Sequence, residues 1–348
     1  MFRKAIFAAA SLAIAGLFGL AHAAEKVVIQ NGSPVPAAAY LDFYVAQEAG
    51  FFADEGLDVE IRYSQGAPQA LQVSASGGAD MGEVAFEPYL FGYSKGIRGK
   101  YYMTSAHYNI FFIAVPEESD IREVADLKGK IIGVSNMGSG SLLVARSMLR
   151  GAGIEPDPSV FLPVGIGDSA LQALRSGKVQ ALSLWDGGYA GLERAGVKLR
   201  YIHHPKIGFV GNAGLFISDA SFEENRDKGV RVIRALRKAR IFIKENLDAA
   251  LDIYWRVNPG AKQGSSEDEA RAMGITELKF MSPFLVDVAI EDIGRFDMEK
   301  LENYMAVMKE EGVFTADLTA RDLASNALIE EVGEFDPEPV RERARNWQ

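Results

Sequence analysis

Strand and helix signals alternate along most of this chain, and this alternation constrains the fold more than any other feature. Lys26–Gln30 and Asp58–Tyr63 are predicted strands, and Tyr40–Ala49 and Pro68–Ser76 are the predicted helices that follow them. Such an order is typical of an α/β fold with a mainly parallel sheet. Further strands are predicted at Lys130–Val134, Val160–Val164, Ala181–Leu184 and Leu199–Tyr201.

From Glu223 onward the signals are mostly helical. Lys228–Asn246 is strongly amphipathic, and Glu299–Glu311 is a helix with a plausible stop at Gly312. Glu330–Arg345 is highly charged, which indicates a loosely packed tail.

One series of signals occurs twice, about 100 residues apart, which suits one copy in each of two lobes. Each copy contains a strand, a glycine loop, a helix, a Ser-Gly turn, an acidic residue and a tyrosine. The matching residues are Ser76-Gly77 with Ser176-Gly177, Glu87 with Asp186, and Tyr89 with Tyr189. Repeated units are a general property of α/β proteins, but this shared order favours two related lobes.

The first 23 residues have the pattern of an export signal. Arg3 and Lys4 supply a positive start, residues 5–20 are almost wholly small or apolar, and Ala21-His22-Ala23 offers a cleavage site. A permanent membrane anchor is the alternative, but the apolar run is short for a span. We therefore expect export to the periplasm and cleavage after Ala23, which leaves about 325 residues, enough for two domains.

The composition excludes two classes of protein. Cysteine is absent, so an exported chain must be stabilised by its cores without disulfide bonds, and it has no thiol for a lipid anchor. The formal net charge is −10, and loss of Arg3 and Lys4 makes it more negative still. An acidic surface repels phosphate backbones, so we expect no nucleic-acid partner.

Three segments of the chain resemble a known family. FYVAQEAGFFADEGLDVEI, ASGGADMG and VADLKGKIIGVSNMGSGS are similar to the solute-binding proteins of ABC importers. The branch that they resemble handles nitrate, sulfonates, taurine and thiamin precursors and includes the THI5-like proteins. The resemblance covers about residues 27–250.

The resemblance implies a type II periplasmic binding protein fold, in which two α/β lobes are joined by two crossing segments with a ligand cleft between them. The crossings are expected near Phe112–Val115 and Gly208–Phe216. Lobe 1 would then be 24–112, lobe 2 113–216, and 217–348 would return to lobe 1 and add C-terminal helices. The family implies a monomer whose partners are a small-molecule ligand and an inner-membrane ABC permease with its ATPase.

Binding loops of open α/β sheets follow the carboxyl ends of strands. Here they are Asn31–Pro36, Gln65–Pro68, Glu83–Glu87, Asn136–Ser141, Gly165–Ser169 and Trp185–Tyr189. The fourth is glycine-rich and precedes a helix, so its backbone and hydroxyls could hold an anion. Ser141 could instead simply cap the helix. The family resemblance implies ligand contact for Gly138, Ser139, Gly140 and Ser141.

Acidic and aromatic residues make up most of the other candidates. Lobe 1 supplies Ser33, Pro34, Tyr40, Gln65, Glu83, Phe86 and Glu87, lobe 2 supplies Trp185, Asp186 and Tyr189, and His107 and Tyr108 precede the first crossing. The alternative roles are core packing for Tyr40, simple exposure to solvent for the carboxylates, and a structural role for His107. Together, the acidic and aromatic candidates suit a ligand that has a flat ring with N–H donors or an ammonium group, such as a pyrimidine-like compound.

We therefore predict a binding protein that captures a small organic molecule and delivers it to a permease. An organic sulfonate, a carboxylate or nitrate remains an alternative ligand, and a periplasmic sensor is a second rival. A third rival is an enzyme of the THI5-like or menaquinone-pathway type. We expect no catalytic set and no cofactor. We also expect no metal site, because His203 and His204 lack helical metal-ligand spacing.

Overall fold

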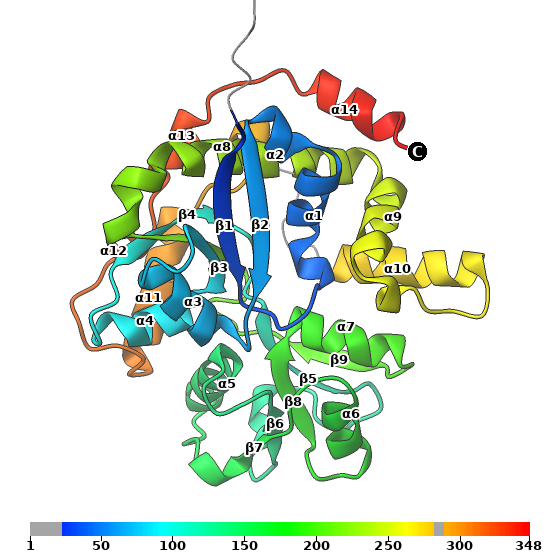
Figure 1. Cartoon of the computed structure of the whole chain (residues 1–348). Coiled ribbons are helices and arrows are strands. Elements are labelled where there is room, and N and C mark those ends of the chain that lie inside the picture. The colour runs from blue at the N-terminus through cyan, green and yellow to red at the C-terminus, as the bar shows by residue number, and fades with distance from the viewer. Residues whose placement is uncertain (1–22, 282–288) are drawn as a thin grey trace, which may run out of the picture.

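The computed structural model describes residues 23–281 and 289–348, which form two lobes around two five-stranded sheets (Figure 1). Lobe 1 contains β1 (Glu25–Asn31), β2 (Leu57–Tyr63), β3 (Met81–Ala85), β4 (Gly99–Thr104) and β10 (Ala213–Ser218). Lobe 2 contains β5 (Phe111–Pro116), β6 (Ile132–Val134), β7 (Phe161–Pro163), β8 (Ala181–Trp185) and β9 (Leu199–Ile202). All but the last residue of the expected export signal lies outside the described residues.

The two sheets have the same plan. Their strand orders are β2-β1-β3-β10-β4 and β7-β6-β8-β5-β9. In each, the first three strands are parallel, and the fourth is antiparallel to both of its neighbours. Four of the five strands of each sheet therefore run in the same direction, which confirms the expectation of mainly parallel sheets, and the one antiparallel strand of each sheet enters from the other lobe.

The crossings between the lobes lie earlier in the chain than expected. Residues 112–115 are inside β5, so the first crossing is the stretch 105–110, and the second is 203–212. The two run side by side, with Asn109 N donating to Gly208 O at 3.0 Å. A Cβ on Gly211 would lie 1.8 Å from Ala106 O, so only glycine permits this approach.

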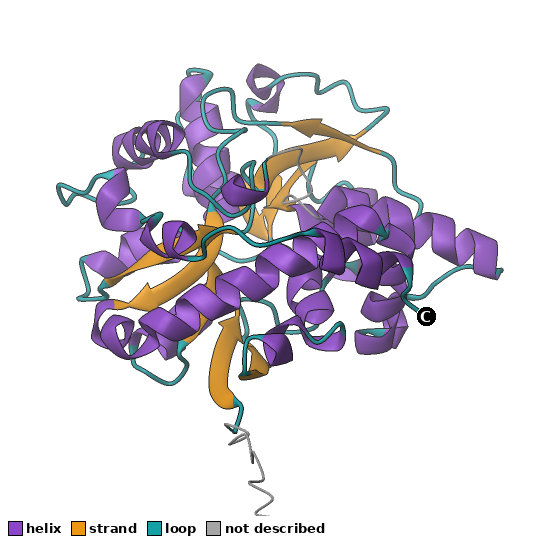
Figure 2. Cartoon of the chain, turned by 90° about the horizontal axis from the view of Figure 1, so that it is seen from above, coloured by secondary structure: helices purple, strands orange, loops and turns teal. Residues whose placement is uncertain are grey.

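Helices lie on both sides of the strands when the molecule is seen from above (Figure 2). Those of lobe 1 are α1 (Leu41–Glu48), α2 (Phe51–Asp54), α3 (Ala67–Ala75), α4 (Glu87–Tyr93), α8 (Asp219–Glu245), α9 (Leu247–Val257), α10 (Glu267–Met281), α11 (Met298–Glu310), α12 (Ala320–Leu323), α13 (Ala327–Glu331) and α14 (Glu338–Arg345). Lobe 2 carries α5 (Gly140–Gly151), α6 (Asp168–Arg175) and α7 (Asp186–Arg194). Short 3-10 turns are η1 (Ala38–Tyr40), η2 (Val124–Leu127), η3 (Pro158–Val160), η4 (Pro259–Ala261) and η5 (Ile290–Asp292). Within the described ranges, no helix is long and apolar enough to cross a membrane.

The long helix α8 holds lobe 1 together. Ser218 caps its start by accepting a hydrogen bond from Ser221 N at 3.2 Å, which satisfies one of the free N–H groups of the first turn. Its apolar face packs with α1 and the sheet in one core. Within this core, Arg240 of α8 and Asp42 of α1 form a buried ion pair at 2.8 Å.

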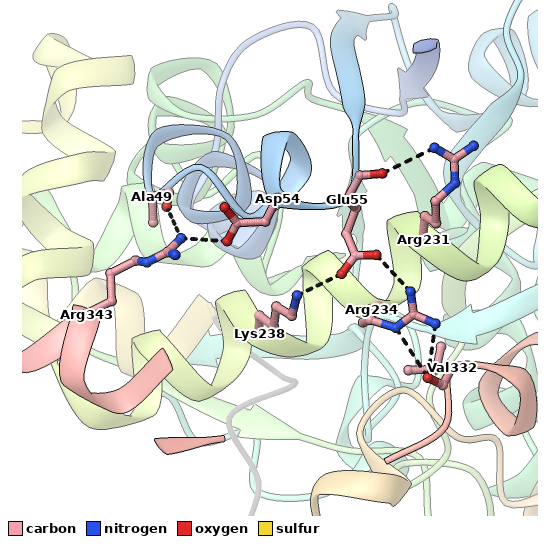
Figure 3. A network of polar contacts seen from close by, with 8 residues as sticks. All are labelled: Ala49, Asp54, Glu55, Arg231, Arg234, Lys238, Val332 and Arg343. Atoms are coloured by element: carbon pink, nitrogen blue, oxygen red, sulfur yellow. Dashed lines mark hydrogen bonds and ion pairs between the residues drawn. The ribbon is translucent and has the colours of Figure 1, made fainter. Parts of the chain in front are cut away.

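The charged C-terminal segment is docked, so the expectation of a loose tail was wrong. Val332, Val340 and Ala344 are buried in the core that α8 shares, and the Trp347 ring lies 5.4 Å from that of Phe242. Arg343 of α14 donates to Ala49 O at 2.7 Å and pairs with Asp54 at 2.9 Å (Figure 3). Charged residues of this segment, such as Glu331 and Arg343, therefore form ion pairs, and its apolar residues contact the core.

Candidate binding site between the lobes

Two polar side chains end strands of lobe 1 inside the protein. Asn31 of β1 and Glu83 of β3 are neighbours in the parallel register and are both buried. Glu83 Oε1 accepts a hydrogen bond from the Ser105 hydroxyl, at the start of the first crossing. Glu83 Oε2 and both polar atoms of the Asn31 side chain have no hydrogen-bond partner among the described residues. Buried groups of this kind are costly unless something pairs with them, so they mark a place for a polar ligand.

The charge state of Glu83 is set mainly by its burial. Burial, opposed by the Ser105 hydrogen bond and by Arg240 and aided by the Asp42 carboxylate, raises the pKa of Glu83 to about 8. Tyr40, which precedes α1, is close enough to Glu83 and Asp186 for both carboxyls to add to the burial effect that raises its pKa. Tyr40 therefore lies between an acid of lobe 1 and an acid of lobe 2.

Asp186 is the corresponding acid of lobe 2, at the start of α7. It is buried, its Oδ1 accepts from Gly187 N at 2.7 Å, and burial raises its pKa to about 7. The Tyr108 hydroxyl, on the first crossing, is 3.5 Å from Asp186 Oδ2 and donates to Phe280 O of α10 at 3.0 Å. Since α10 also packs against α7, this lobe 1 helix contacts lobe 2 beside the acid.

Glu87 starts α4, directly after β3, and is also buried. Its Oε1 accepts from Asn212 Nδ2 at 2.8 Å and from the Tyr304 hydroxyl at 2.7 Å. Its Oε2 has no hydrogen-bond partner within the described chain. Burial raises the pKa of Glu87 to about 7.

The glycine-rich loop of lobe 2 caps α5. Ser139 is the N-cap, and its oxygen accepts from Ser141 N at 3.2 Å and lies 2.8 Å from the Ser141 oxygen. Gly138 N donates to Asn136 Oδ1 at 2.9 Å. In this structure the hydrogen bonds of Ser139 and Ser141 therefore cap the start of α5. Gly140 lies next to Glu87, and a Cβ on Gly140 would be 2.9 Å from Glu87 Oε2.

Two predicted site residues are core residues. Phe86 is 0% exposed, and its ring centroid lies 4.5 Å from that of Tyr101. Tyr189 is also 0% exposed, and its hydroxyl donates to Phe112 O at 2.7 Å inside lobe 2. We correct both predictions, because each ring packs among apolar core side chains, Phe86 in lobe 1 and Tyr189 in lobe 2.

Four other predicted residues lie in or near loops between the lobes. Ser33 and Pro34 follow β1, where the Ser33 hydroxyl donates to Val35 O at 2.7 Å. Gln65 is exposed, and its backbone N donates to Gln69 Oε1 at 2.8 Å. Trp185 is half-buried and packs against the lobe 2 core. Among residues 23–281 and 289–348, no hydrogen bond joins the side chain of Ser33, Pro34 or Gln65 to the acids.

His107 faces a different space. It lines a cavity of about 70 Å³ with Phe209, Arg295 and Lys300, beside the second crossing. Burial, together with the charges of Arg240 and Lys300, lowers the pKa of His107 to about 4. His107, which is part of the first crossing, is therefore neutral at neutral pH.

Sequence reasoning missed residues that complete the site. Asn31 lay inside a predicted binding loop but was not chosen, and Ser105 is the first residue of the first crossing. Asn212 and Tyr304 bind Glu87 from 125 and 217 residues away along the chain. Pairing over such separations leaves no local signal. In the described chain, no group of three His, Cys, Asp or Glu side chains could hold a metal ion.

Comparison with known proteins identifies the family. Residues 38–250 match the family model described as NMT1/THI5 like. The chain belongs to the NMT1/THI5-like family. The remaining described segments, including Tyr304, lie outside the matched range.

Relatives in this family include proteins named for binding. A Bacillus subtilis (strain 168) protein named "Putative aliphatic sulfonates-binding protein" is 28% identical over 216 residues, which cover 60% of this chain and 64% of that protein. A "Formylaminopyrimidine-binding protein" of Halalkalibacterium halodurans is 26% identical over 63% of this chain and 66% of its own length. The matches thus span about two thirds of these relatives.

Solved structures of other proteins share this architecture. The periplasmic aliphatic sulphonate binding protein SsuA from Escherichia coli superposes with a TM-score of 0.62 at 17% identity, covering 86% of this chain and 92% of that one. At this identity the likeness concerns the fold alone. The chain therefore has the periplasmic binding protein fold that its sequence motifs predicted.

Proposed function

We propose that this protein is the solute-binding component of an ABC importer, which encloses a small organic molecule between its lobes and delivers it to a membrane permease. The family, the names of its relatives and the two-lobed fold support this proposal. The observation that carries it is the set of buried polar atoms without partners at Asn31 and Glu83, where the strands of lobe 1 end. A bound solute would pair with these atoms and offset the cost of burying them.

The chemistry of these groups favours a nitrogen heterocycle or another ligand rich in N–H donors. Glu83 and Asp186 supply carboxyl oxygens from opposite lobes, and the Asn31 amide can both donate and accept. Tyr40 and Tyr108 offer aromatic surface beside them. The formylaminopyrimidine-binding relative is consistent with this ligand class.

Binding would act through the two crossings. A ligand that contacts Glu83 and Asp186 together favours the closed arrangement of the lobes, by no more than its difference in affinity for the closed and open states. The permease would then recognise the closed form. We further propose that the protein is monomeric and works in the periplasm after removal of residues 1–23.

Isothermal titration calorimetry on the mature protein tests the ligand class. Aminopyrimidines, aromatic amines, alkanesulfonates and nitrate would be titrated into the wild type, Glu83→Gln and Glu60→Gln. Glu60 is an exposed acid of lobe 1 and serves as the matched control. We expect an aminopyrimidine or amine to bind the wild type and the control, and to bind Glu83→Gln at least tenfold more weakly.

Tight binding of nitrate or an alkanesulfonate alone would overturn the ligand class. Two observations support that anion-binding alternative: the start of α5 with its serine N-cap, and the name of the Bacillus subtilis relative. Accumulation of a chemically altered product would instead favour the enzyme alternative.

A further inference from the structure

A carboxylate of lobe 1 lies at the start of a helix of lobe 2. Glu87 is 1% exposed, and its Oε2 is 2.9 Å from the point that a Cβ on Gly140 would occupy. Gly140 is the first residue of α5, a helix of 12 residues. The contact therefore joins the acid of one lobe to the positive end of a helix dipole in the other.

Three neighbours define this position. Asn212 on the second crossing and Tyr304 on α11 both donate to Glu87 Oε1, so the other oxygen is left facing α5. The Phe111 ring also lies 2.5 Å from the Cβ position of Gly140. Any side chain at residue 140 would collide with the ring or the carboxylate, and glycine alone permits the approach.

The start of a helix is a ready site for an anion, because its N–H groups and its dipole both favour negative charge. Here a side chain of the protein itself already supplies that charge. A sulfonate, nitrate or carboxylate entering between the lobes would meet the Glu87 carboxylate instead of a vacant anion site. Like charges this close in a buried place repel strongly.

We propose that Glu87 is a specificity-determining residue, which occupies the anion position at the start of α5 with its own carboxylate and so excludes anionic ligands. This inference rests on the proposed function and narrows it to neutral or cationic solutes. Removal of the side chain would expose the Asn212 amide, the Tyr304 hydroxyl and the first turn of α5. These donors together form a site for a small anion.

The test uses the mature full chain with methanesulfonate and nitrate as probes, measured by calorimetry and by thermal shift. We expect the wild type and Glu60→Gln to bind these anions only weakly, and Glu87→Ala to bind methanesulfonate at least tenfold more tightly. Equal anion affinity in the wild type and Glu87→Ala would overturn the proposal, as would micromolar binding by the wild type. Circular dichroism of each variant checks that it is folded.

A second measurement needs no variant. Burial raises the pKa of Glu87 to about 7, so the carboxyl is mostly neutral at pH 5.5 and mostly charged at pH 8. The titratable groups that face it are Tyr101 of β4 and Tyr304 of α11, and burial raises the pKa of both well above the usual value. Methanesulfonate affinity of the wild type should therefore rise at least threefold from pH 8 to pH 5.5, and no change would contradict the inference.

The two proposals can fail separately. If no heterocycle or amine binds but Glu87→Ala gains methanesulfonate binding, the proposed ligand class is wrong and the role of Glu87 stands. If an aminopyrimidine binds as proposed and Glu87→Ala gains no anion affinity, the proposed function stands and the role of Glu87 is wrong.

Discussion

Glu83 couples the stability of the fold to pH. Its pKa is about 8 in the folded protein and near 4.5 when unfolded, so between these values the folded state holds a proton that the unfolded state has lost. Stability should therefore fall as pH rises across this range, by up to about 1.4 kcal/mol for each pH unit. Glu83→Gln, which cannot ionise, should flatten this fall.

Urea unfolding at several pH values between 5 and 8.5 measures the effect. The exposed Glu60→Gln variant is the control and should retain the slope of the wild type. A slope that is identical in all three proteins would show that Glu83 ionises in the folded state as it does in water.

At the scale of residues, the sequence predicted the acids better than their partners. Glu83 and Glu87 were chosen because they follow the Gly-Gly-Ala-Asp turn, where the structure has β3, and Asp186 was chosen because it follows the predicted strand that became β8. The rings of Phe86 and Tyr189 follow the same strands, yet they point into the cores. A shift of one residue decides whether a side chain points toward the ligand or into the core. The local pattern does not determine this shift at the end of a strand.

At the scale of elements, Glu55 joins three parts of lobe 1 (Figure 3). This carboxylate follows α2 and accepts from Arg234 at 2.8 Å and from Lys238 at 2.7 Å, both on α8. Arg234 also donates to Val332 O of the C-terminal segment at 3.2 Å. Because the Glu55 side chain is only 8% exposed, its loss leaves two cations without their common partner in a poorly hydrated place.

We expect Glu55→Ala to lower the free energy of unfolding by about 1–3 kcal/mol and to loosen the C-terminal segment. Chemical denaturation measures the first effect, and hydrogen exchange of α14 measures the second. Glu60→Ala removes an exposed acid paired with Arg62, and it should change neither quantity measurably. Normal protection of α14 in Glu55→Ala would mean that apolar contacts alone hold the segment.

The elements themselves were largely predictable, but their pairing was not. The predicted strands of lobe 2 agree with β6 to β9 within two residues, because apolar runs bounded by turns are local signals. The antiparallel strands β5 and β10 join a sheet only after the chain has crossed between the lobes. The crossings were therefore misplaced, since nothing local distinguishes a crossing from a strand.

At the scale of the whole molecule, the repeated series of signals corresponds to a repeated architecture. Glu87 begins the helix after β3 and Asp186 begins the helix after β8, at equivalent positions of two sheets with equivalent strand orders. The two acids therefore hold equivalent positions in the two lobes. Burial raises the pKa of an acid in each lobe, so the protonation of these acids must adjust when a ligand enters.

Ligand binding should consequently release protons at neutral pH. Burial raises the pKa of Glu83 to about 8 and that of Asp186 to about 7, so at pH 7 both carboxyls are partly protonated in the free protein. A ligand that donates N–H groups or carries positive charge favours the ionised carboxylates, which lowers their pKa on binding. Affinity should therefore increase as pH rises from about 6 to 8, with up to about one proton released per carboxyl. Calorimetry in two buffers of different ionisation enthalpy counts these protons, and Glu83→Gln should release fewer than the wild type. Proton uptake on binding would contradict this arrangement, because it would mean that the ligand requires the neutral acids.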